Sequence, residues 1–386
     1  MIRKISADLV IPVDGTPLKN GVVTFSEDGT VISVNENTED PDIEKYSGVL
    51  VPGFVNTHNH LELAYMEGIL PKHTGLPGFV KGIMEVKMEF PEEVQKKAIA
   101  REDEYMWNSG VQAVGDISNT PVSFSIKRDS KIKYVTYLEI FDLLFDKDYT
   151  QIMCEGVELF QETLKYGIEA YITLHSTYNV SKPLFDAWAS MPHTEAMSIH
   201  FMESAHDDTL FHKEGGFWEF FRERGIPLDY LEELSSLNRV IKGIPSDRRL
   251  LLVHNTNATS EVVERMKENY PRVSWALCPC SNLYIEDKLP PVDMLRSKDI
   301  NLTIGTDSLS SNTQLSMIAE MRAITNNFNI PLEEIIKWAT LNGAKALELD
   351  DKIGSFTPGK NPGAVVIENI MEDFMFTGSS DSKRLI

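Results

Sequence analysis

The sequence contains little cysteine, no long hydrophobic run and a deficit of positive charge. Three cysteines among 386 residues are too few for a disulfide framework, and the start of the chain lacks a secretion-type hydrophobic region, so we expect a cytoplasmic protein. No stretch approaches the roughly 20 uninterrupted apolar residues of a membrane helix. With 37 basic and 58 acidic side chains the net charge is -21, which would repel nucleic-acid phosphates and anionic membrane surfaces. We therefore expect neither nucleic acid nor a membrane as a partner.

In its overall composition the sequence is that of an ordinary globular protein, with 42% hydrophobic and 25% charged side chains. Within residues 1–50, short apolar runs are separated by turn residues, and Glu-Asp-Gly-Thr at 27–30 predicts a hairpin between two of them. This segment predicts a small antiparallel sheet. Residues 353–386 again indicate turn and strand without a helix. We expect them beside the N-terminal strands, in one small β domain formed by both chain termini.

The middle of the chain, residues 51–352, has a different pattern. Continuous apolar runs alternate with amphipathic stretches of helical periodicity, which is typical of parallel strands covered by helices. Eight such runs fit a closed (β/α)8 barrel, so the predicted fold class is α/β. The predicted strands lie near residues 54–57, 113–116, 134–140, 170–174, 197–201, 250–254, 273–277 and 302–305.

Two histidines, His58 and His60, follow the first of these strands with one residue between them. Because alternate side chains of a strand point to the same side, both imidazoles converge on one point. Neutral imidazole is a common ligand of zinc and also suits iron and nickel, so such a pair is half of a metal site. An isolated His-x-His pair is nevertheless more often two histidines hydrogen-bonded to loop backbone.

Further candidate ligands end other predicted strands. His200, His254 and Asp307 each follow an apolar run, and Glu203 lies three residues after His200. In a (β/α)8 barrel the carboxyl ends of all strands meet at one face, where functional groups collect. The sequence therefore predicts a single metal site at that face, with Glu203 beside it.

At these residues the sequence resembles the amidohydrolase superfamily, in the branch of cytosine, guanine and adenosine-type deaminases and triazine chlorohydrolases. The resemblance runs over nearly the whole chain and implies a distorted (β/α)8 TIM barrel with a composite β-sandwich from the two termini. Residues 60–63 and 306–312 look most like aminodeoxyfutalosine deaminases. The matching segments are residues 52–62, 175–181, 200–204, 253–254, 278–282, 305–308 and 354–360.

The resemblance also implies how many metal ions are bound and which residues bind them. Binuclear relatives use a carbamylated lysine on the fourth strand, and residues 169–175 contain no lysine, so one divalent ion is expected. Zinc is the first choice, with iron or nickel as alternatives. His175, which ends this strand, would face the substrate, unless it only caps the strand through backbone hydrogen bonds. The implied metal ligands are His58, His60, His200 and Asp307.

The chemistry of such a site follows from charge. A bound divalent ion lowers the pKa of water to about 7, and the resulting hydroxide attacks an electrophilic carbon. Glu203 would take up a proton and deliver it to a ring nitrogen or a departing amine. Asp307 would assist as ligand and base, and His254 would position or polarise the water. Glu203, His254 and Asp307 are therefore the expected catalytic residues.

The expected function is hydrolytic deamination of a small-molecule substrate. The substrate would be an amino-substituted N-heterocycle such as a purine or an adenosine-like nucleoside, and ammonia would be released. Two alternatives stay open: metal-dependent hydrolysis of an amide, cyclic imide or aryl halide, and a barrel without catalysis that serves as a scaffold. The intact candidate ligands argue against the scaffold. Similar enzymes are commonly dimers, so a homodimer stays open too.

Three further features leave questions for the structure. Residues 206–249 are long for a βα connection and rich in phenylalanine, which fits a lid or a packed core equally well. Cys278 and Cys280 are expected as free thiols on the substrate side and not as metal ligands. Related deaminases bind a ribose with a carboxylate from the segment after the first strand, and the candidates here are Glu67, Glu85 and Glu89.

Overall fold

A computed structural model of the protein describes residues 2–36, 40–86, 90–143, 147–226, 228, 231, 234–371 and 374–386. Its centre is a ring of parallel strands in two four-stranded sheets. The first sheet has the order β6 (Phe54–Asn59), β7 (Val111–Ser118), β8 (Lys133–Ile140) and β9 (Glu169–Leu174). The second has the order β10 (Ala196–Phe201), β11 (Arg249–His254), β12 (Val273–Leu277) and β13 (Asn301–Ile304).

The two sheets meet at both of their edges and close the ring. Isolated parallel bridges join Ser176 to His200 at one seam and Asn59 to Asp307 at the other. The eight-stranded barrel predicted from the apolar runs is thereby confirmed, and the sparse pairing at the two seams is its distortion. His200 and Asp307, two predicted metal ligands, lie at these seams.

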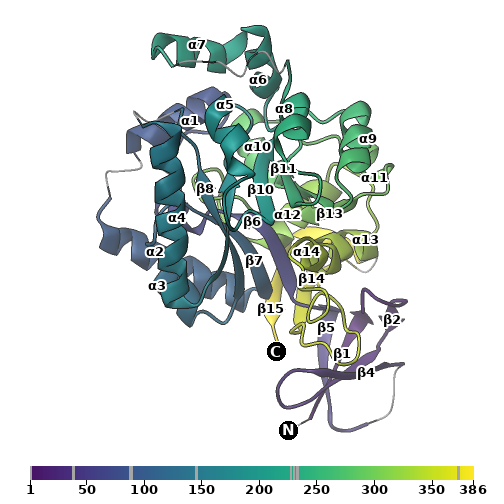
Figure 1. Cartoon of the computed structure of the whole chain (residues 1–386). Helices are drawn as coiled ribbons and strands as arrows, with labels where there is room; N and C mark the ends of the chain where they lie inside the picture. The colour runs from purple at the N-terminus through teal and green to yellow at the C-terminus, as the bar shows by residue number, and fades with distance from the viewer. Residues whose placement is uncertain are drawn as a thin grey trace.

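Helices surround the ring (Figure 1). In α4 the helix ends are set locally, because the Asp148 side chain accepts hydrogen bonds from the backbone N–H of Thr150 and Gln151, and Gly167 ends the helix at φ 66°. The covering helices are α1 (Gly75–Val86), α2 (Glu92–Asn108), α3 (Phe124–Asp129), α4 (Tyr149–Tyr166), α5 (Lys182–Trp188), α8 (Ser236–Gly243), α9 (Ser260–Asn269), α10 (Pro279–Glu286), α11 (Val292–Arg296), α12 (Met317–Thr325), α13 (Leu332–Lys337) and α14 (Gly343–Ala346).

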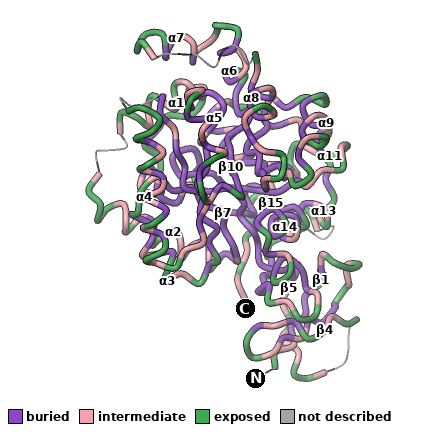
Figure 2. The backbone as a smooth tube through the Cα atoms, in the orientation of Figure 1, coloured by how far each residue is buried: buried purple, intermediate pink, exposed green. Residues whose placement is uncertain are grey.

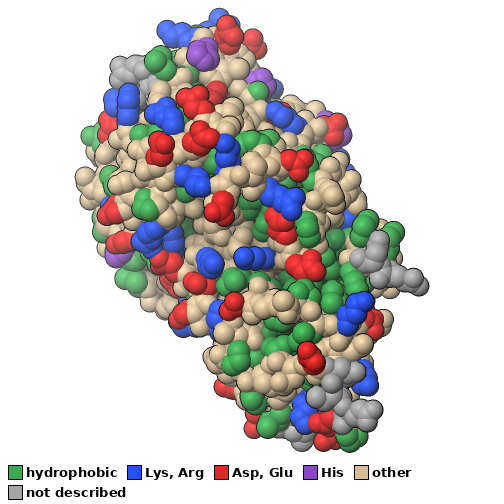
Figure 3. Space-filling model, turned by 90° about the vertical axis from the view of Figure 1, so that its right-hand side faces the viewer, with side chains coloured by type: hydrophobic (Ala, Val, Ile, Leu, Met, Phe, Trp, Pro, Cys, Tyr) green, Lys and Arg blue, Asp and Glu red, His purple; other side chains and the backbone are tan. Residues whose placement is uncertain are grey.

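Burial follows these layers. Figure 2 shows a buried ring of strands inside helices whose outward faces are exposed. β10 and β11 are buried along their whole length, which explains why their sequences are continuous apolar runs without alternation. The face in Figure 3 carries acidic and basic side chains close together. Among the described helices, none combines the length and apolar character needed to cross a bilayer.

Both chain termini contribute to a separate seven-stranded sheet outside the barrel (Figure 1). The predicted hairpin is the antiparallel pair β3–β4, and the C-terminal strand β14 joins β5 in antiparallel orientation. The prediction of a purely antiparallel N-terminal sheet is wrong in one place: β1 and β5 pair in parallel. The β3–β4 hairpin occupies one edge of β1. The following strand, β5, therefore pairs with the other edge of β1 and runs in the same direction. The strands are β1 (Arg3–Val10), β2 (Leu18–Lys19), β3 (Val22–Phe25), β4 (Val31–Asn35), β5 (Ile43–Val51), β14 (Val365–Ile370) and β15 (Phe376–Arg384).

A cap of short helices projects from one end of the barrel (Figure 1). It contains α6 (Ala205–Thr209), η2 (Leu210–His212) and α7 (Gly215–Glu223). Phe217 and Phe221 of α7 are fully buried in a hydrophobic cluster of their own, which also includes Tyr178 and Leu76 of α1. The aromatic residues of this long connection thus form a packed core, which is one of the two readings that the sequence allowed.

Candidate metal centre

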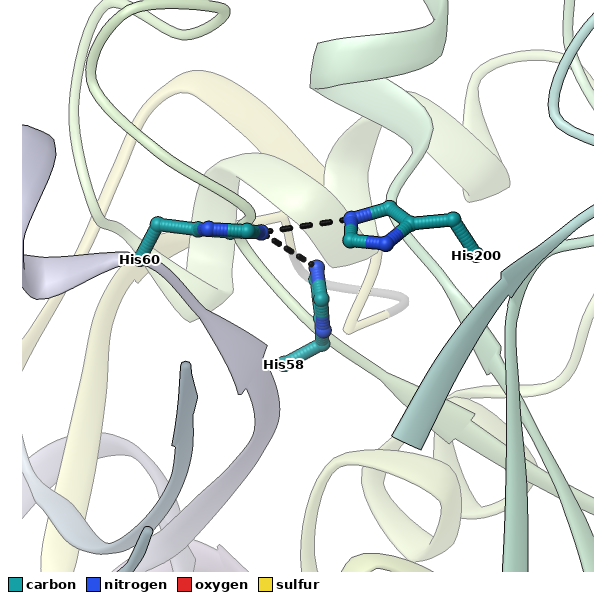
Figure 4. A group of neighbouring side chains, drawn as sticks. All are labelled: His58, His60 and His200. Carbon is teal, nitrogen blue, oxygen red and sulfur yellow. Dashed lines mark hydrogen bonds between the residues drawn. The ribbon is translucent and has the colours of Figure 1, made fainter. Parts of the chain in front are cut away.

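Three histidines converge at the carboxyl end of the barrel (Figure 4). His58 is the second-last residue of β6, His60 follows that strand directly, and His200 is near the end of β10. The Nε2 atom of His60 lies 3.1 Å from Nε2 of His58 and 3.2 Å from Nε2 of His200. The two-residue spacing of His58 and His60 therefore aims both rings at one point, as the strand periodicity predicted, and the barrel brings His200 to the same point.

Asp307 completes this group from the opposite seam. Its Oδ1 lies 3.6 Å from His60 Nε2 and 3.8 Å from His58 Nε2. The hydroxyls of Ser281 and Ser311 donate to the other oxygen, Oδ2, at 2.6 and 2.9 Å, so the carboxylate is held with Oδ1 toward the histidines. Asp307 has φ 55°, an unusual backbone conformation for a residue with a side chain.

The donor set fits a divalent cation. Burial, the largest effect, and the neighbouring histidines lower the pKa of His58 well below its usual value, and burial also lowers that of His200. The rings are therefore neutral near pH 7. The Nδ1 of His200 donates to the backbone oxygen of His175 at 2.9 Å, which leaves the Nε2 lone pair for a ligand. With Zn–N bonds of about 2.0–2.1 Å, two nitrogens that bind one zinc ion lie roughly 3 Å apart, close to the 3.1 and 3.2 Å that separate His60 Nε2 from the other two ring nitrogens.

Glu203 and His254 lie beside the four donors. Nε2 of His254 is 3.4 Å from Glu203 Oε1 and 4.0 Å from Asp307 Oδ2. Burial is the main cause that raises the pKa of Glu203 well above its usual value, and nearby carboxylates add to it. Burial lowers the pKa of His254 to about 3, so its ring is neutral. Asn282 Nδ2 donates to His254 Nδ1 at 3.1 Å, which leaves the ring proton on Nε2, facing the carboxylates.

A buried ion pair supports the turn that carries His58 and His60. Asp116, near the end of β7, accepts hydrogen bonds at Oδ1 from Leu61 N at 2.9 Å and from Asn59 Nδ2 at 3.2 Å. Its Oδ2 pairs with Lys127 Nζ at 2.5 Å, and both side chains are fully buried. This pair was not predicted from the sequence. The position of Asp116 at the end of a predicted strand could have marked it as a candidate. Nothing in the sequence, however, indicates that it pairs with Lys127 of α3.

A second support lies behind Asp307. Asn312 Nδ2 donates to the backbone oxygen of Thr306 at 2.9 Å and to Glu320 Oε1 at 2.8 Å. The other oxygen of Glu320 accepts the backbone N–H of Cys280 at 2.9 Å. Glu320 therefore ties the loop of Asp307 to the start of α10. This buried acid of α12 was also missed, because it lies inside an amphipathic helix where an acid usually faces solvent.

Glu139 is a further residue of the site that was not predicted from the sequence. It is buried at the end of β8, and it forms with His175 and His200 a second group whose potential ligand atoms lie within 4.8 Å of one another. The ring of His175 stacks on that of His200, with centroids 4.5 Å apart. The His200 nitrogen that faces Glu139 is Nδ1, 3.7 Å from Oε1, and its proton is already donated to the backbone oxygen of His175. Nδ1 therefore offers no lone pair to a second ion, and the lone pair of Nε2 faces the first group.

The other candidates are placed apart from this centre. Cys278 is a buried free thiol and Cys280 a half-buried one, and neither belongs to a metal-type group among the described residues. Glu67 pairs with Arg101 at 2.7 Å near the surface, and Glu85 is exposed. Glu89 lies outside the described residues.

A cavity of about 720 Å³ opens beside the donors, a size typical of small-molecule sites. His60, His200, Glu203 and Asp307 line its inner end, together with His175. Its remaining wall comes largely from α1, α4 and the end of β8. His175 is therefore at the cavity surface while its backbone oxygen holds His200, so the two readings of this residue are both compatible with its position.

Comparison with known proteins agrees with this architecture. The family model described as Amidohydrolase family matches residues 49–384. A 5'-deoxyadenosine deaminase of Methanobrevibacter smithii is 24% identical over 396 residues, covering 97% of this chain and 86% of that protein. Helicobacter pylori aminofutalosine deaminase, in complex with methylthio-coformycin, has the same fold, with a TM-score of 0.78 and 23% identity over 97% of this chain and 93% of that one. An adenosine deaminase from Xanthomonas campestris with bound zinc gives a TM-score of 0.72 and 23% identity, covering 95% and 84%.

Proposed function

This chain belongs to the amidohydrolase family, and from this premise we propose that it is a metal-dependent hydrolytic deaminase of an adenosine-like nucleoside. The reaction would replace the exocyclic amine of the purine by oxygen and release ammonia. The observation that carries the proposal is the juxtaposition of four converging donors with a buried carboxyl, Glu203, whose raised pKa favours its protonated form.

In the proposed site His58, His60, His200 and Asp307 hold one divalent cation. Such a cation, when bound, makes a water molecule nucleophilic near neutral pH. Zinc is the preferred ion, because neutral imidazoles together with one carboxylate are donors that suit zinc. The zinc-containing relative from Xanthomonas campestris has the same fold, which supports this choice.

Glu203 is the proposed proton carrier. Its carboxyl lines the cavity and lies 3.4 Å from His254 Nε2. With its pKa raised by burial, Glu203 exchanges a proton at moderate cost. In its protonated form Glu203 donates its proton to a ring nitrogen as the water attacks. The carboxylate left behind takes a proton from that water and passes it to the amine, which leaves as ammonia, and the second proton of the water restores the protonated carboxyl.

His254 and Asp307 are proposed to orient the attacking water. The neutral ring of His254 presents its Nε2 proton between the carboxylates of Glu203 and Asp307. Asp307, held by two serine hydroxyls, accepts a hydrogen bond from the water and so fixes its direction of attack. His175, at the cavity surface, would contact the purine.

The experiment that tests this function is a substrate panel. The protein, purified with its own metal and with zinc added, is given aminopurine nucleosides and pterins, and ammonia is measured with the matching oxo product. Release of ammonia from an adenosine-like nucleoside is the expected result. Acid or halide release without ammonia from amides, cyclic imides or aryl halides would replace deamination by the alternative hydrolysis. The absence of stoichiometric metal would point to a scaffold.

Two finer features complete the proposal. We place the enzyme in the cytoplasm, because its three cysteines are all free thiols in the structure. We further propose a homodimer in solution, which size-exclusion chromatography with light scattering tests directly.

A further inference from the structure

Asp207 is a fully buried acid to which the proposed reaction assigns no part. It lies in the first turn of α6, within the cap, and none of its surface is exposed. Its Oδ2 accepts the backbone N–H of Glu203 at 3.0 Å. Its Oδ1 has no hydrogen-bond partner among the residues that the structure describes. A buried carboxyl that leaves one oxygen unpaired costs stability, so packing alone does not explain this residue.

The bond from Asp207 closes a tight turn that carries Glu203. β10 ends at Phe201, and Met202 then turns the chain with φ 49°, in the left-handed region that is costly for residues with side chains. On one side of the turn, the backbone oxygen of Met202 accepts the N–H of Asn257 at 2.9 Å. On the other side, Asp207 accepts the N–H of Glu203. The backbone of Glu203 is thus held by a side chain of the cap.

The position of this backbone sets where the Glu203 carboxyl lies. Its Oε1 is 3.4 Å from Nε2 of His254, and the side chain is only 5% exposed. In the proposed reaction this carboxyl must reach both the water and a ring nitrogen of the substrate. A displacement of about 1 Å can lower a rate roughly 10²-fold. Asp207 is not among the described residues that line the cavity, so its influence on the reaction passes through Glu203.

The helix that carries Asp207 is itself held by its neighbours. The Nδ1 of His206 accepts the backbone N–H of Gly216 in α7 at 3.2 Å, and α7 is packed in the hydrophobic cluster of the cap. The Oδ1 of Asp208 accepts the backbone N–H of Ser236 in α8 at 2.9 Å. A group can position another only if it is held in place, and α6 meets this condition. Of its three consecutive polar side chains, Asp207 is the one that reaches the site.

The turn uses the hydrogen-bond acceptor of Asp207 and not a negative charge. Burial is the main cause that raises the pKa of Asp207 well above its usual value, and the nearby carboxylates of Asp208 and Glu286 add to it. The carboxyl therefore favours its protonated form, which still has an oxygen to accept the N–H of Glu203. An asparagine side chain has the same shape and offers the same acceptor.

From these contacts we propose that Asp207 is a positioning residue for the deamination: its Oδ2 fixes the backbone of Glu203 and so holds the proton-carrying carboxyl beside His254. This inference rests on the proposed deaminase function. It gives the cap a part in the reaction, because a cap residue places the proton carrier.

The first test compares two substitutions of Asp207 in the zinc-loaded enzyme, with the nucleoside of the panel that releases ammonia fastest. Asp207→Ala removes the acceptor and should lower kcat about 10- to 100-fold while KM changes less than about threefold. Asp207→Asn keeps the acceptor and should retain kcat within about threefold. Both variants should keep the metal content. An equal loss of kcat in the two variants overturns the inference, and so does full kcat in Asp207→Ala.

The matched control is Asp208→Ala. It removes a carboxylate from the same helix, together with a bond to a backbone N–H of the same kind, but that N–H belongs to Ser236. We expect kcat of this variant to stay within about threefold of the unaltered protein. A fall as large as that of Asp207→Ala would assign the effect to the packing of the cap and overturn the inference.

A double variant tests whether Asp207 acts through Glu203. Once Glu203→Gln has removed the proton carrier, the placement of this side chain no longer matters. Adding Asp207→Ala to Glu203→Gln should therefore change kcat less than about threefold. Losses that multiply would show an independent effect of Asp207 and overturn the inference alone. No ammonia from any nucleoside of the panel with the unaltered, metal-loaded protein overturns the deaminase function and this inference together.

Discussion

The two ends of the cavity are built by different physical means. At the inner end, hydrogen bonds orient key polar side chains, as for Asp307 with the hydroxyls of Ser281 and Ser311 and for His200 with the backbone oxygen of His175. At the outer end, Phe79, Ile83 and their neighbours are half-buried apolar side chains held by the helix that carries them. The inner end is therefore a directional polar network, whereas the outer end presents mainly apolar area.

The inner end also stores backbone strain. His254 and Asp307 have φ values of 74° and 55°, in the left-handed region that is costly for residues with side chains. Such conformations persist where the surrounding contacts determine them. The described apolar residues of α1 have no such conformation. We therefore expect changes at the inner end to cost far more than changes at the outer end.

The largest effect is expected for the metal ligands. His58→Ala should remove the bound divalent ion and lower the activity by more than about 10³-fold, beyond the 10- to 100-fold typical of residues that only support a ligand. Metal analysis of the purified protein measures the ion directly. The matched control is His73→Ala, an exposed histidine whose side chain is 55% accessible, which should keep both metal and activity. Full metal content in His58→Ala would contradict the assigned ligand set.

A smaller loss is expected at the proton carrier. Glu203→Gln keeps the size of the side chain but removes its exchangeable proton, so kcat should fall by about 10²- to 10⁴-fold. The metal content should equal that of the unaltered protein, because Glu203 is not among the proposed ligands. If Glu203→Gln instead lost the ion, the division between ligands and proton carrier would be wrong.

The buried ion pair of Asp116 and Lys127 supports the turn that carries His58 and His60, and its removal tests how much stability this support contributes. Lys127→Met leaves the Asp116 carboxylate buried without its cation, so the free energy of unfolding should fall by about 3–5 kcal/mol. Urea unfolding measures this change. The control Lys133→Met removes a lysine that is 52% exposed and lies 3.1 Å from Glu169, and it should cost at most about 1 kcal/mol. Equal effects of the two variants would show that the turn does not depend on the pair.

The smallest expected effect is a pH dependence set by Glu320. Burial raises its pKa to about 8, against the opposing hydrogen bonds from Cys280 and Asn312. Between about pH 4.5 and 8 the folded state then binds one more proton than the unfolded state, so this group lowers the stability as pH rises, by up to about 1.4 kcal/mol per pH unit. Glu320→Gln should flatten this slope in urea unfolding at pH 5.5, 6.5 and 7.5. The same slope in both proteins would contradict the raised pKa.

Much of the architecture could be predicted because its signals are local. Each of the eight apolar runs became a barrel strand, since a strand buried on both faces requires a continuous apolar sequence. The amphipathic stretches between these runs became covering helices, as α2 and α9 show. The parallel pairing of β1 with β5 was not predictable in this way, because the direction of a partner strand is not encoded in the periodicity of either.

In the candidate site, too, some residues could be predicted from the sequence and others could not. His58, His60, His200 and Asp307 were predicted to converge from their positions at strand ends, and the structure brings them together. Asp116 and Glu320 were not singled out, because their importance lies in partners far away in the sequence. That α1 lines the cavity could not be predicted either, since its residues have the pattern of an ordinary amphipathic helix.

The strands, the helices and the side chains available for chemistry could be read from the sequence, because they depend on local periodicity and on the intrinsic properties of imidazole and carboxyl groups. Which of those groups face one another, how burial shifts their pKa values, and that one face of α1 borders a cavity are properties of the folded chain. Distance and desolvation depend on residues that are remote in the chain, and they exist only once the barrel has closed.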